Sequence, residues 1–166
     1  YCAYRLAQDF RGMYRYALRP ARNLKERYGT NWCVVTGATG GIGKGYVFEL
    51  VNRGMKVVLV GRDQEKLDAT VKEITEKYPE AELKTIVFNF NRQYTEEVRK
   101  ELAEKFSDIE KCSILINNVG SVNAKKFGEM DDENIHSMLN VNITANTVMA
   151  KLFIPKLLAN EKRGGI

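Results

Sequence analysis

A cluster of glycines after an apolar run is the part of the sequence best suited to bind a phosphorylated ligand. The run is Cys33–Val35, Thr36 ends it, and five glycines follow at Gly37, Gly40, Gly41, Gly43 and Gly45. A diphosphate lies against backbone N–H groups at a helix N-terminus, where side chains would obstruct its approach. One glycine can also supply a positive φ, and another can let helix and strand pack closely. The pattern of strand, glycine turn and helix therefore predicts a phosphate-binding βα unit.

The spacing of these glycines narrows the class of phosphate site. They follow Gly37-x-x-x-Gly41-x-Gly43, which differs from the G-x-G-x-x-G of the usual dinucleotide fingerprint. A P-loop is excluded, because Ala38 replaces its first glycine and Gly45 replaces the Ser or Thr that would hold magnesium. A glycine turn without a ligand is the alternative for this segment taken alone.

Arg62 lies directly after the second apolar run and indicates which dinucleotide would bind. An NAD-selective fold places an acidic residue about 20 residues after the glycine turn, where it accepts a hydrogen bond from the ribose 2′-hydroxyl. Here Gly61 occupies that place, and the planar guanidinium of Arg62 suits a 2′-phosphate. We therefore expect NADP(H) as the cofactor, with a plain surface arginine as the alternative. Asp63 is expected to cap the helix that follows.

The elements that must position these residues alternate between strand and helix. Strands are expected at 33–35, 56–60, 83–88 and 113–117, and helices at 42–52, 64–78, 95–106 and 132–158, with Pro155 as a candidate kink in the last helix. Continuous apolar strands between helices predict an α/β fold, a doubly wound parallel sheet of the Rossmann type covered on both faces. We expect the strand order 3-2-1-4, with the ligand crevice beyond the carboxyl ends of strands one and four. The chain stops where a fifth strand is expected.

An N-terminal arm precedes this domain, so residues 1–29 are expected to form a helical arm and linker and residues 30–166 the Rossmann domain. Residues 1–19 have helical spacing, with Pro20 as its limit and residues 20–31 as a linker. The apolar face carries Leu6, Phe10, Met13 and Ala17. The opposite face carries Arg11, Arg15, Arg19 and Arg22. A basic amphipathic helix of this kind lies on an anionic membrane, packs on a domain or a partner protein, or belongs to a targeting segment.

Charge and composition argue against several other classes of protein. The net charge is +5, but residues 1–29 carry all of it, and residues 30–166 balance 19 basic against 19 acidic side chains. A neutral body argues against a nucleic-acid-binding domain. Three scattered cysteines and a single histidine, His136, predict neither a disulfide framework nor a metal site. No run of 18 apolar residues occurs, so no membrane span is expected.

Three motifs resemble the short-chain dehydrogenase/reductase family. The first is the T-G-x-x-x-G-I-G segment from Thr36, and the second is Asn117-Asn118-Val119-Gly120 after the fourth apolar run, which is similar to the family's N-N-A-G. The third is Asn140-Val141-Asn142, within the last expected helix. The lead-in Tyr28-Gly29-x-x-Trp32, Val119 in place of Ala, and residues 53–55 are most similar to the branch of 17-beta-hydroxysteroid dehydrogenases and very-long-chain 3-oxoacyl-CoA reductases. The resemblance covers roughly residues 28–166.

The resemblance implies roles for particular residues. The implied cofactor-binding residues are Gly37, Thr39, Gly41, Ile42, Gly43, Arg62, Asn89, Asn117, Asn118 and Gly120. Asn89 stands where the family generally has an Asp that meets the adenine ring, and an amide can still hydrogen-bond that base. Asn142 is the implied catalytic residue, whose side chain helps to hold an ordered water for proton relay. Asn140 is the competing candidate for that role.

The resemblance also implies an activity, a partner and a location. It implies interconversion of a ketone and an alcohol with NADP(H), on a lipid-like small molecule such as a steroid or a 3-oxoacyl-CoA. The family's Ser and Tyr-x-x-x-Lys are expected beyond the fifth strand, and this chain has no Tyr after Gly120. The alternative is a non-catalytic structural or assembly subunit that still binds NADP(H). A homo-oligomer or a larger complex is expected, at the endoplasmic reticulum membrane or, alternatively, in the mitochondrion.

Overall fold

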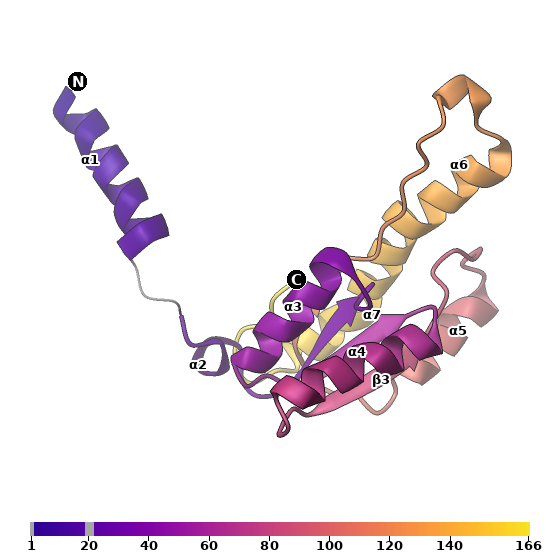
Figure 1. The fold of residues 1–166 in the computed structure, drawn as a ribbon, viewed down its shortest axis with the longest axis horizontal. Coiled ribbons are helices and arrows are strands. Elements are labelled where there is room, and N and C mark those ends of the chain that lie inside the picture. Colours follow the sequence, from indigo (N-terminus) through magenta and orange to yellow (C-terminus); the bar gives the residue numbers. More distant parts are fainter. Residues whose placement is uncertain (1, 19–21) are drawn as a thin grey trace.

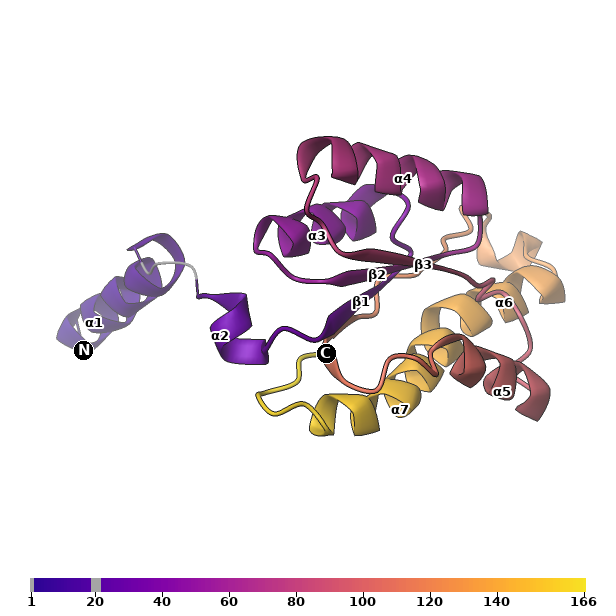
Figure 2. The same ribbon diagram turned by 90° about the horizontal axis from the view of Figure 1, so that it is seen from below.

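The computed structural model describes residues 2–18 and 22–166, of which residues 2, 3 and 16 are described by their backbone alone. The predictions for Arg19 and Pro20 therefore lie outside the described residues. A central sheet is covered on each face by helices (Figure 1). Seen edge-on, α3 and α4 lie on one face, whereas α5 and α7 lie on the other (Figure 2). This is the doubly wound α/β arrangement that the alternation of apolar strands and amphipathic helices predicts.

The sheet has four parallel strands in the order β3-β2-β1-β4, which confirms the expected order. The strands are β1 Trp32–Thr36, β2 Val57–Gly61, β3 Leu83–Val87 and β4 Cys112–Ile116. β2 is buried along its whole length, because helices cover both of its faces. Gly165 pairs with β4 on its outer side, through hydrogen bonds of 2.8 and 3.1 Å to Leu115 and Ser113. Residues close to the C-terminus thus extend the sheet beyond β4.

The helices around the sheet begin and end close to their expected bounds. They are α3 Gly41–Asn52, α4 Gln64–Lys77, α5 Glu96–Lys105, α6 Asp132–Leu139 and α7 Ala145–Leu158, with a short 3₁₀ turn, η2, at Phe127–Glu129. Asp63 caps α4 as predicted, since its side chain accepts a hydrogen bond from the backbone of Lys66. Thr95 caps α5 in the same way. These caps set where each helix starts relative to the sheet.

The single long helix expected over 132–158 is divided into three parts. A π-helical segment, η3 Asn140–Thr144, separates α6 from α7. Pro155, where a kink was considered, lies inside α7. At the division, the side chain of Asn146 donates a hydrogen bond of 2.8 Å to the carbonyl of Asn142. Side chains that bond to helix carbonyls compete with the regular backbone pattern, and π-helical turns commonly occur at functional sites.

The core consists of two apolar layers, one on each face of the sheet. One layer holds Phe106 and Phe153, whose rings meet edge to face with their centroids 5.0 Å apart. The other packs α3 and α4 against the opposite face of β1 and β2. Cys33 and Cys112 belong to opposite layers, and burial raises the pKa of both thiols, to about 12 at Cys112. Both cysteines therefore act as small core residues.

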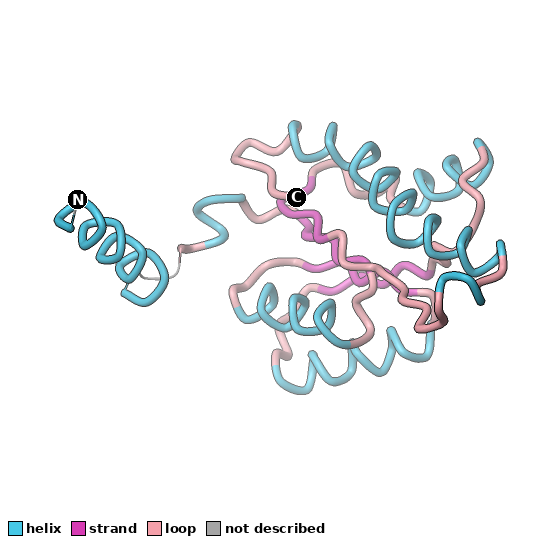
Figure 3. Tube along the Cα trace, turned by 90° about the horizontal axis from the view of Figure 1, so that it is seen from above, coloured by secondary structure: helices cyan, strands magenta, loops and turns pink. Residues whose placement is uncertain are grey.

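The N-terminal segment has three helical parts. They are α1 Cys2–Met13, the π-helical η1 Tyr14–Leu18, and α2 Leu24–Tyr28. α2 falls within the predicted linker, where Asn23 caps it by accepting hydrogen bonds from Lys25 and Glu26. α1 lies apart from the layered domain (Figures 1 and 3). Within the described residues, none of the helices is long and apolar enough to cross a membrane.

Candidate cofactor site

The glycine turn between β1 and α3 has the geometry that a close backbone approach requires. Gly37 and Gly41 adopt φ values of +65° and +51°, a conformation that residues with a Cβ rarely adopt. A Cβ on Gly43 would lie 2.1 Å from the carbonyl oxygen of Gly37, so only glycine lets α3 pack this closely on the turn. Gly40, which precedes α3, has no side chain to cap the helix. The first N–H groups of α3 thus face outward at the positive end of a helix dipole.

The loop after β4 is joined to this turn by Asn118 and Thr36. The side-chain amide of Asn118 donates to the carbonyls of Thr36 and Gly37 at 3.0 and 3.2 Å. The buried hydroxyl of Thr36 accepts hydrogen bonds of 3.0 Å from the backbone N–H groups of Asn118 and Val119. Asn118 and Thr36 therefore hold two neighbouring strand ends in one arrangement, which agrees with the predicted role of Asn118 in shaping the pocket.

Asn117 and Asn142 act on the helical side of the same loop. Asn117 donates a hydrogen bond of 3.3 Å to the carbonyl of Asn146. The side-chain amide of Asn142 makes two hydrogen bonds to the backbone of Ser121, each 2.8 Å long. Its oxygen accepts from the N–H of Ser121, and its N–H₂ group donates to the Ser121 carbonyl. Asn142 is therefore a positioning residue for the loop after Gly120, and its predicted role toward a water stays a prediction. Asn140 lies half-buried at the first position of η3.

A cleft of about 270 Å³ opens beyond the carboxyl ends of the strands, where the fold predicts a ligand. Five of the predicted cofactor residues line it: Gly37, Thr39, Arg62, Asn89 and Gly120. The other lining residues were not predicted as site residues: Gly61, Phe88, Phe90, Asn91, Val119, Ser121, Ser137 and Val141. Gly41, Ile42, Gly43, Asn117 and Asn118 lie outside the lining. Among these, Gly43 and Asn118 support the turn from behind, and Gly41 and Ile42 form the exposed start of α3.

Arg62 lies at the rim of the cleft, directly after β2. Its side chain is exposed, and no carboxylate within the described residues pairs with it. The neighbouring Asp63 faces α4 instead, where it accepts from the backbone N–H of Lys66 and lies 3.7 Å from the Lys66 ammonium. The guanidinium of Arg62 is consequently free of any competing acid, as a phosphate-binding arginine requires.

Asn89 occupies the next strand end along the cleft. Its side-chain oxygen accepts a hydrogen bond of 3.0 Å from the backbone N–H of Asn91, which forms a local turn. Its amide N–H₂ group donates to no acceptor among residues 2–18 and 22–166, and it remains available as a donor. Asn89 can therefore still meet a purine base, chiefly by donating a hydrogen bond.

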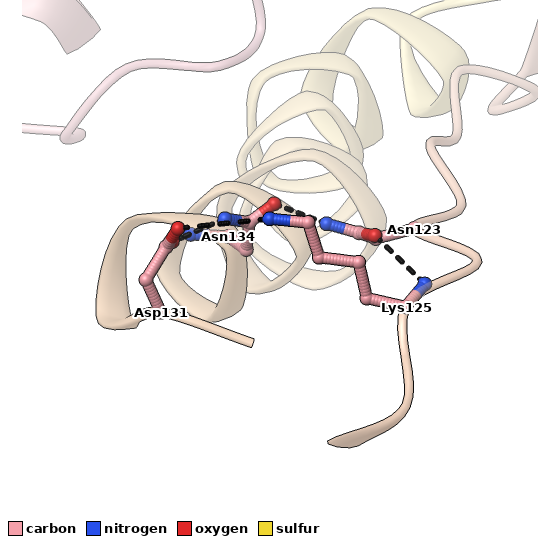
Figure 4. Close-up of polar contacts among 4 residues, drawn as sticks. All are labelled: Asn123, Lys125, Asp131 and Asn134. Atoms are coloured by element: carbon pink, nitrogen blue, oxygen red, sulfur yellow. Dashed lines mark hydrogen bonds and ion pairs between the residues drawn. The ribbon is translucent and has the colours of Figure 1, made fainter. Parts of the chain in front are cut away.

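The segment between β4 and α6 is braced by a small polar cluster (Figure 4). Asn123 accepts from the backbone of Lys125 at 3.0 Å and donates to the side chain of Asn134. Asp131 caps α6 by accepting from the backbone and side chain of Asn134, and these hydrogen bonds lower the pKa of its carboxyl group. The Lys125 ammonium lies 3.9 Å from the same carboxylate. The cluster gives this exposed loop a defined shape beside the cleft.

Two other parts of the molecule do not have the character of a catalytic centre. A larger hollow of about 460 Å³ lies at the amino ends of the strands, between α2, the end of α4 and the start of β2 and β3. In open parallel sheets the ligand crevice is at the opposite, carboxyl end. His136 is exposed on α6, and residues 2–18 and 22–166 contain no cluster of His, Cys, Asp or Glu that could hold a metal ion.

Three residues important for the site were missed at the sequence level. Thr36 was recognised as the end of an apolar run and the start of the glycine motif but was given no role in the site, although a polar residue inside a buried strand is a usable signal. Ser121 was overlooked, and its importance follows from its contact with Asn142. Asn146 holds the carbonyl of Asn142, and the side-chain oxygens of Asn146 and Asn117 are buried acceptors to which no described residue donates. An Asn inside an expected helix is a weak signal for such a role.

The fold and the glycine turn define a dinucleotide-binding domain of the Rossmann class. The sequence matches the short chain dehydrogenase family over residues 31–166, and the chain belongs to that family. It is 39% identical over 166 residues to a very-long-chain 3-oxoacyl-CoA reductase of Caenorhabditis elegans, which it matches over 96% of its own length and 51% of that protein. The chain therefore spans about half the length of this relative.

A second relative and a solved structure extend the comparison. The chain is 34% identical to the human inactive hydroxysteroid dehydrogenase-like protein 1, over 84% of its own length and 42% of that protein. The fold superposes on a short-chain dehydrogenase from Sphingobium yanoikuyae in complex with NADPH with a TM-score of 0.68 and 26% identity. That match covers 77% of this chain and 49% of the other. The predicted family and its branch are thus confirmed.

Proposed function

We propose that this chain is the cofactor-binding half of an NADP(H)-dependent reductase that acts on a lipid-like carbonyl compound, such as a 3-oxoacyl-CoA or a steroid ketone. The observation that carries the proposal is Arg62, which stands at the rim of the cleft without an acidic partner among the described residues. The absence of an acid at Gly61 removes the usual partner of an NAD ribose. The names of the curated relatives support the substrate class.

The residues present fit a dinucleotide phosphate. The turn has two glycines at positive φ, Gly40 and Gly41 leave open space at the start of α3, and Gly43 lets that helix pack directly on the turn. The N–H groups at the start of α3 would hold the diphosphate, Arg62 the 2′-phosphate and Asn89 the adenine. When bound, NADPH supplies a hydride to the carbonyl carbon of the substrate.

The chain's own contribution to the reaction is to bind the cofactor and to hold the loops that line the cleft. Asn118 and Thr36 hold the glycine turn against the loop after β4. Asn142 fixes the backbone of Ser121, which lines the same cleft. The group that donates a proton to the carbonyl oxygen would come from a part of the protein beyond these residues, since no Tyr follows Gly120 here.

The test is the cofactor preference of Arg62→Ala in the full-length protein. A charge-assisted bidentate contact contributes about 1.5–3 kcal/mol, so the variant should lose roughly ten- to a hundredfold in NADPH affinity. Its affinity for NADH should change little, because NADH has no phosphate for Arg62 to hold. Lys66→Ala is the matched control, since it removes the same charge one turn into α4 and outside the cleft. Equal weakening of both cofactors by Arg62→Ala would show that Arg62 is structural and would refute the NADP(H) assignment.

A non-catalytic, structural or assembly subunit is the second candidate. A human relative of similar identity is named as inactive, which favours this alternative. The two candidates differ in turnover, which can be followed as oxidation of NADPH in the presence of a 3-oxoacyl-CoA or a steroid ketone. Turnover by the purified protein eliminates the second candidate, whereas tight NADPH binding without turnover and a stable complex with other chains eliminates the first.

We also propose association with the endoplasmic reticulum membrane, with the mitochondrion as the alternative. The resemblance to the 3-oxoacyl-CoA reductase branch supports the first location. Fractionation of cells that express the tagged full-length protein, with markers for both organelles, decides between the two. Size-exclusion chromatography with light scattering tests the proposed homo-oligomer.

A further inference from the structure

The N-terminal helical segment, α1 with η1, presents an apolar face that none of the other described elements covers. α1 stands away from the domain in two perpendicular views (Figures 1 and 2). Leu6 and Phe10 are 68% and 67% exposed, and Met13 is 48% exposed on the same side of the helix. Leu6, Ala7, Phe10 and Tyr14 line one shallow apolar groove. Side chains of this size are unfavourable in water, so the face is built to be covered.

The charges around this face identify what covers it. Arg11, which was expected on the opposite face, lines the apolar groove, Arg15 follows one turn later, and both are exposed. Asp9 is the single acidic residue of residues 1–18. Tyr4 and Tyr14 add aromatic rings with a polar end, which suit the boundary between an apolar phase and water. An apolar stripe edged by arginines and tyrosines matches the acyl and headgroup layers of an anionic membrane.

The position of the segment leaves the cofactor cleft open. α2, which follows it, is tied to the domain through the carbonyl of Tyr28, which accepts from Ser113 and Asn160 at 2.8 and 2.7 Å. Ser113 is at the amino end of β4, whereas the cleft lies beyond the carboxyl ends of the strands. The segment therefore joins the domain at the end opposite to the cleft. A membrane or protein bound to the segment would not block the cleft.

We propose that residues 2–18 form an interfacial helix that lies in the plane of an anionic phospholipid surface, with Leu6, Phe10 and Met13 among the acyl chains and Arg11 and Arg15 among the headgroups. Residues 30–166 carry no net charge and offer no comparable electrostatic attraction. The segment would thus supply a membrane contact that is separate from cofactor binding, and the inference does not rest on the proposed reductase activity.

The test is binding of the full-length protein to vesicles of phosphatidylcholine with and without phosphatidylserine, measured by cosedimentation at low and high salt. Binding should require phosphatidylserine and should weaken as salt rises, because surface charges are screened. Arg11→Gln and Arg15→Gln should each weaken binding about fivefold, which corresponds to roughly 1 kcal/mol per arginine near an anionic surface. Phe10→Glu should weaken it by more than about tenfold, since it also removes the aromatic ring that would be buried among the acyl chains.

Gln8→Glu is the matched control for Phe10→Glu. It introduces the same charge on the polar side of α1, where Gln8 donates a hydrogen bond to the hydroxyl of Tyr4, and should cost no more than an arginine substitution. Unchanged NADPH affinity in every variant shows that the domain is still folded. Binding that is indifferent to salt and to phosphatidylserine overturns the proposal. Equal effects of Phe10→Glu and Gln8→Glu also overturn it, as does an arm that mediates self-association or protein binding while the vesicles stay free of protein.

Discussion

Replacing Gly43 by Ala should damage the cofactor site more than any other single methyl group added to α3. The new Cβ would lie 2.1 Å from the carbonyl oxygen of Gly37 and 2.4 Å from the side-chain nitrogen of Asn118. Ordinary van der Waals contact begins at 3.4 Å, so the methyl group fits only if the first turn of α3 moves away from the glycine turn. The nearest neighbour is backbone, which cannot rotate out of the way.

The expected magnitude combines two opposing effects. Ala favours a helix interior over Gly by about 0.5–1 kcal/mol, whereas forcing an extra methyl group into a packed site costs about 1–3 kcal/mol. Gly43→Ala should therefore lower the free energy of unfolding by roughly 1–2 kcal/mol. A misplacement of about 1 Å can reduce the function of a site on the order of a hundredfold, so NADPH and NADH affinities should both fall by at least about tenfold.

Gly45→Ala is the control, because a Cβ on Gly45 would meet nothing within 4 Å. It should raise the free energy of unfolding slightly and leave both cofactor affinities unchanged. Urea denaturation and fluorescence titration with each cofactor measure the two effects. If Gly43→Ala proves as stable as Gly45→Ala and binds NADPH normally, the close approach of α3 to the turn is not required, and the reasoning about this turn is wrong.

Two further predictions concern the supports of the site. Thr36→Val removes the acceptor of two backbone N–H groups after β4 and should cost about 1–3 kcal/mol of stability for each N–H left unpaired, measured by urea denaturation. Thr75→Val, whose hydroxyl bonds only to carbonyls of its own helix, should cost much less, and equal losses would refute the role of Thr36. Hydrogen bonds from Asn134 lower the pKa of the Asp131 carboxyl group. The cap of α6 should therefore be intact above the usual carboxyl range of about pH 4, and it should be lost as the pH falls through the lowered pKa. The amide resonance of Asn134 should shift in that acidic range, and a titration above about pH 4 would contradict the assignment.

Local patterns in the sequence predicted the sheet and the glycine turn well. Each strand is an apolar run, and α3, α4 and α5 each have an apolar stripe, so local patterns located the four strands and these three helices to within a residue or two. Asp63 was correctly predicted as a cap, because capping depends on contacts only three residues apart. The strand order was expected because alternating strands and helices with a glycine turn after the first strand are typical of the doubly wound Rossmann fold.

The supports of the site could not be predicted in the same way. Asn118 reaches Thr36 across more than 80 residues of sequence, and Asn142 reaches Ser121 across 21. Their partners are backbone N–H and C=O groups, which every residue has, so neither contact produces a recognisable pattern of residue types in the sequence. The division of the long helix at η3 was not predicted either, and it coincides with two contacts to the loop after β4: Asn142 with the backbone of Ser121, and Asn117 with the carbonyl of Asn146.

The sequence by itself determined the class of this protein, because the glycine spacing, the apolar strands and Arg62 are local features whose chemistry does not depend on distant parts of the chain. Only the tertiary structure decided which of the predicted residues face the cleft and which support it from behind. It placed Gly37, Thr39, Arg62, Asn89 and Gly120 around one opening and put Gly43 and Asn118 beneath the turn. The physical reason is that burial and hydrogen bonding are satisfied collectively: a side chain lines a site or supports it according to which distant backbone groups the packed layers bring within about 3 Å of it.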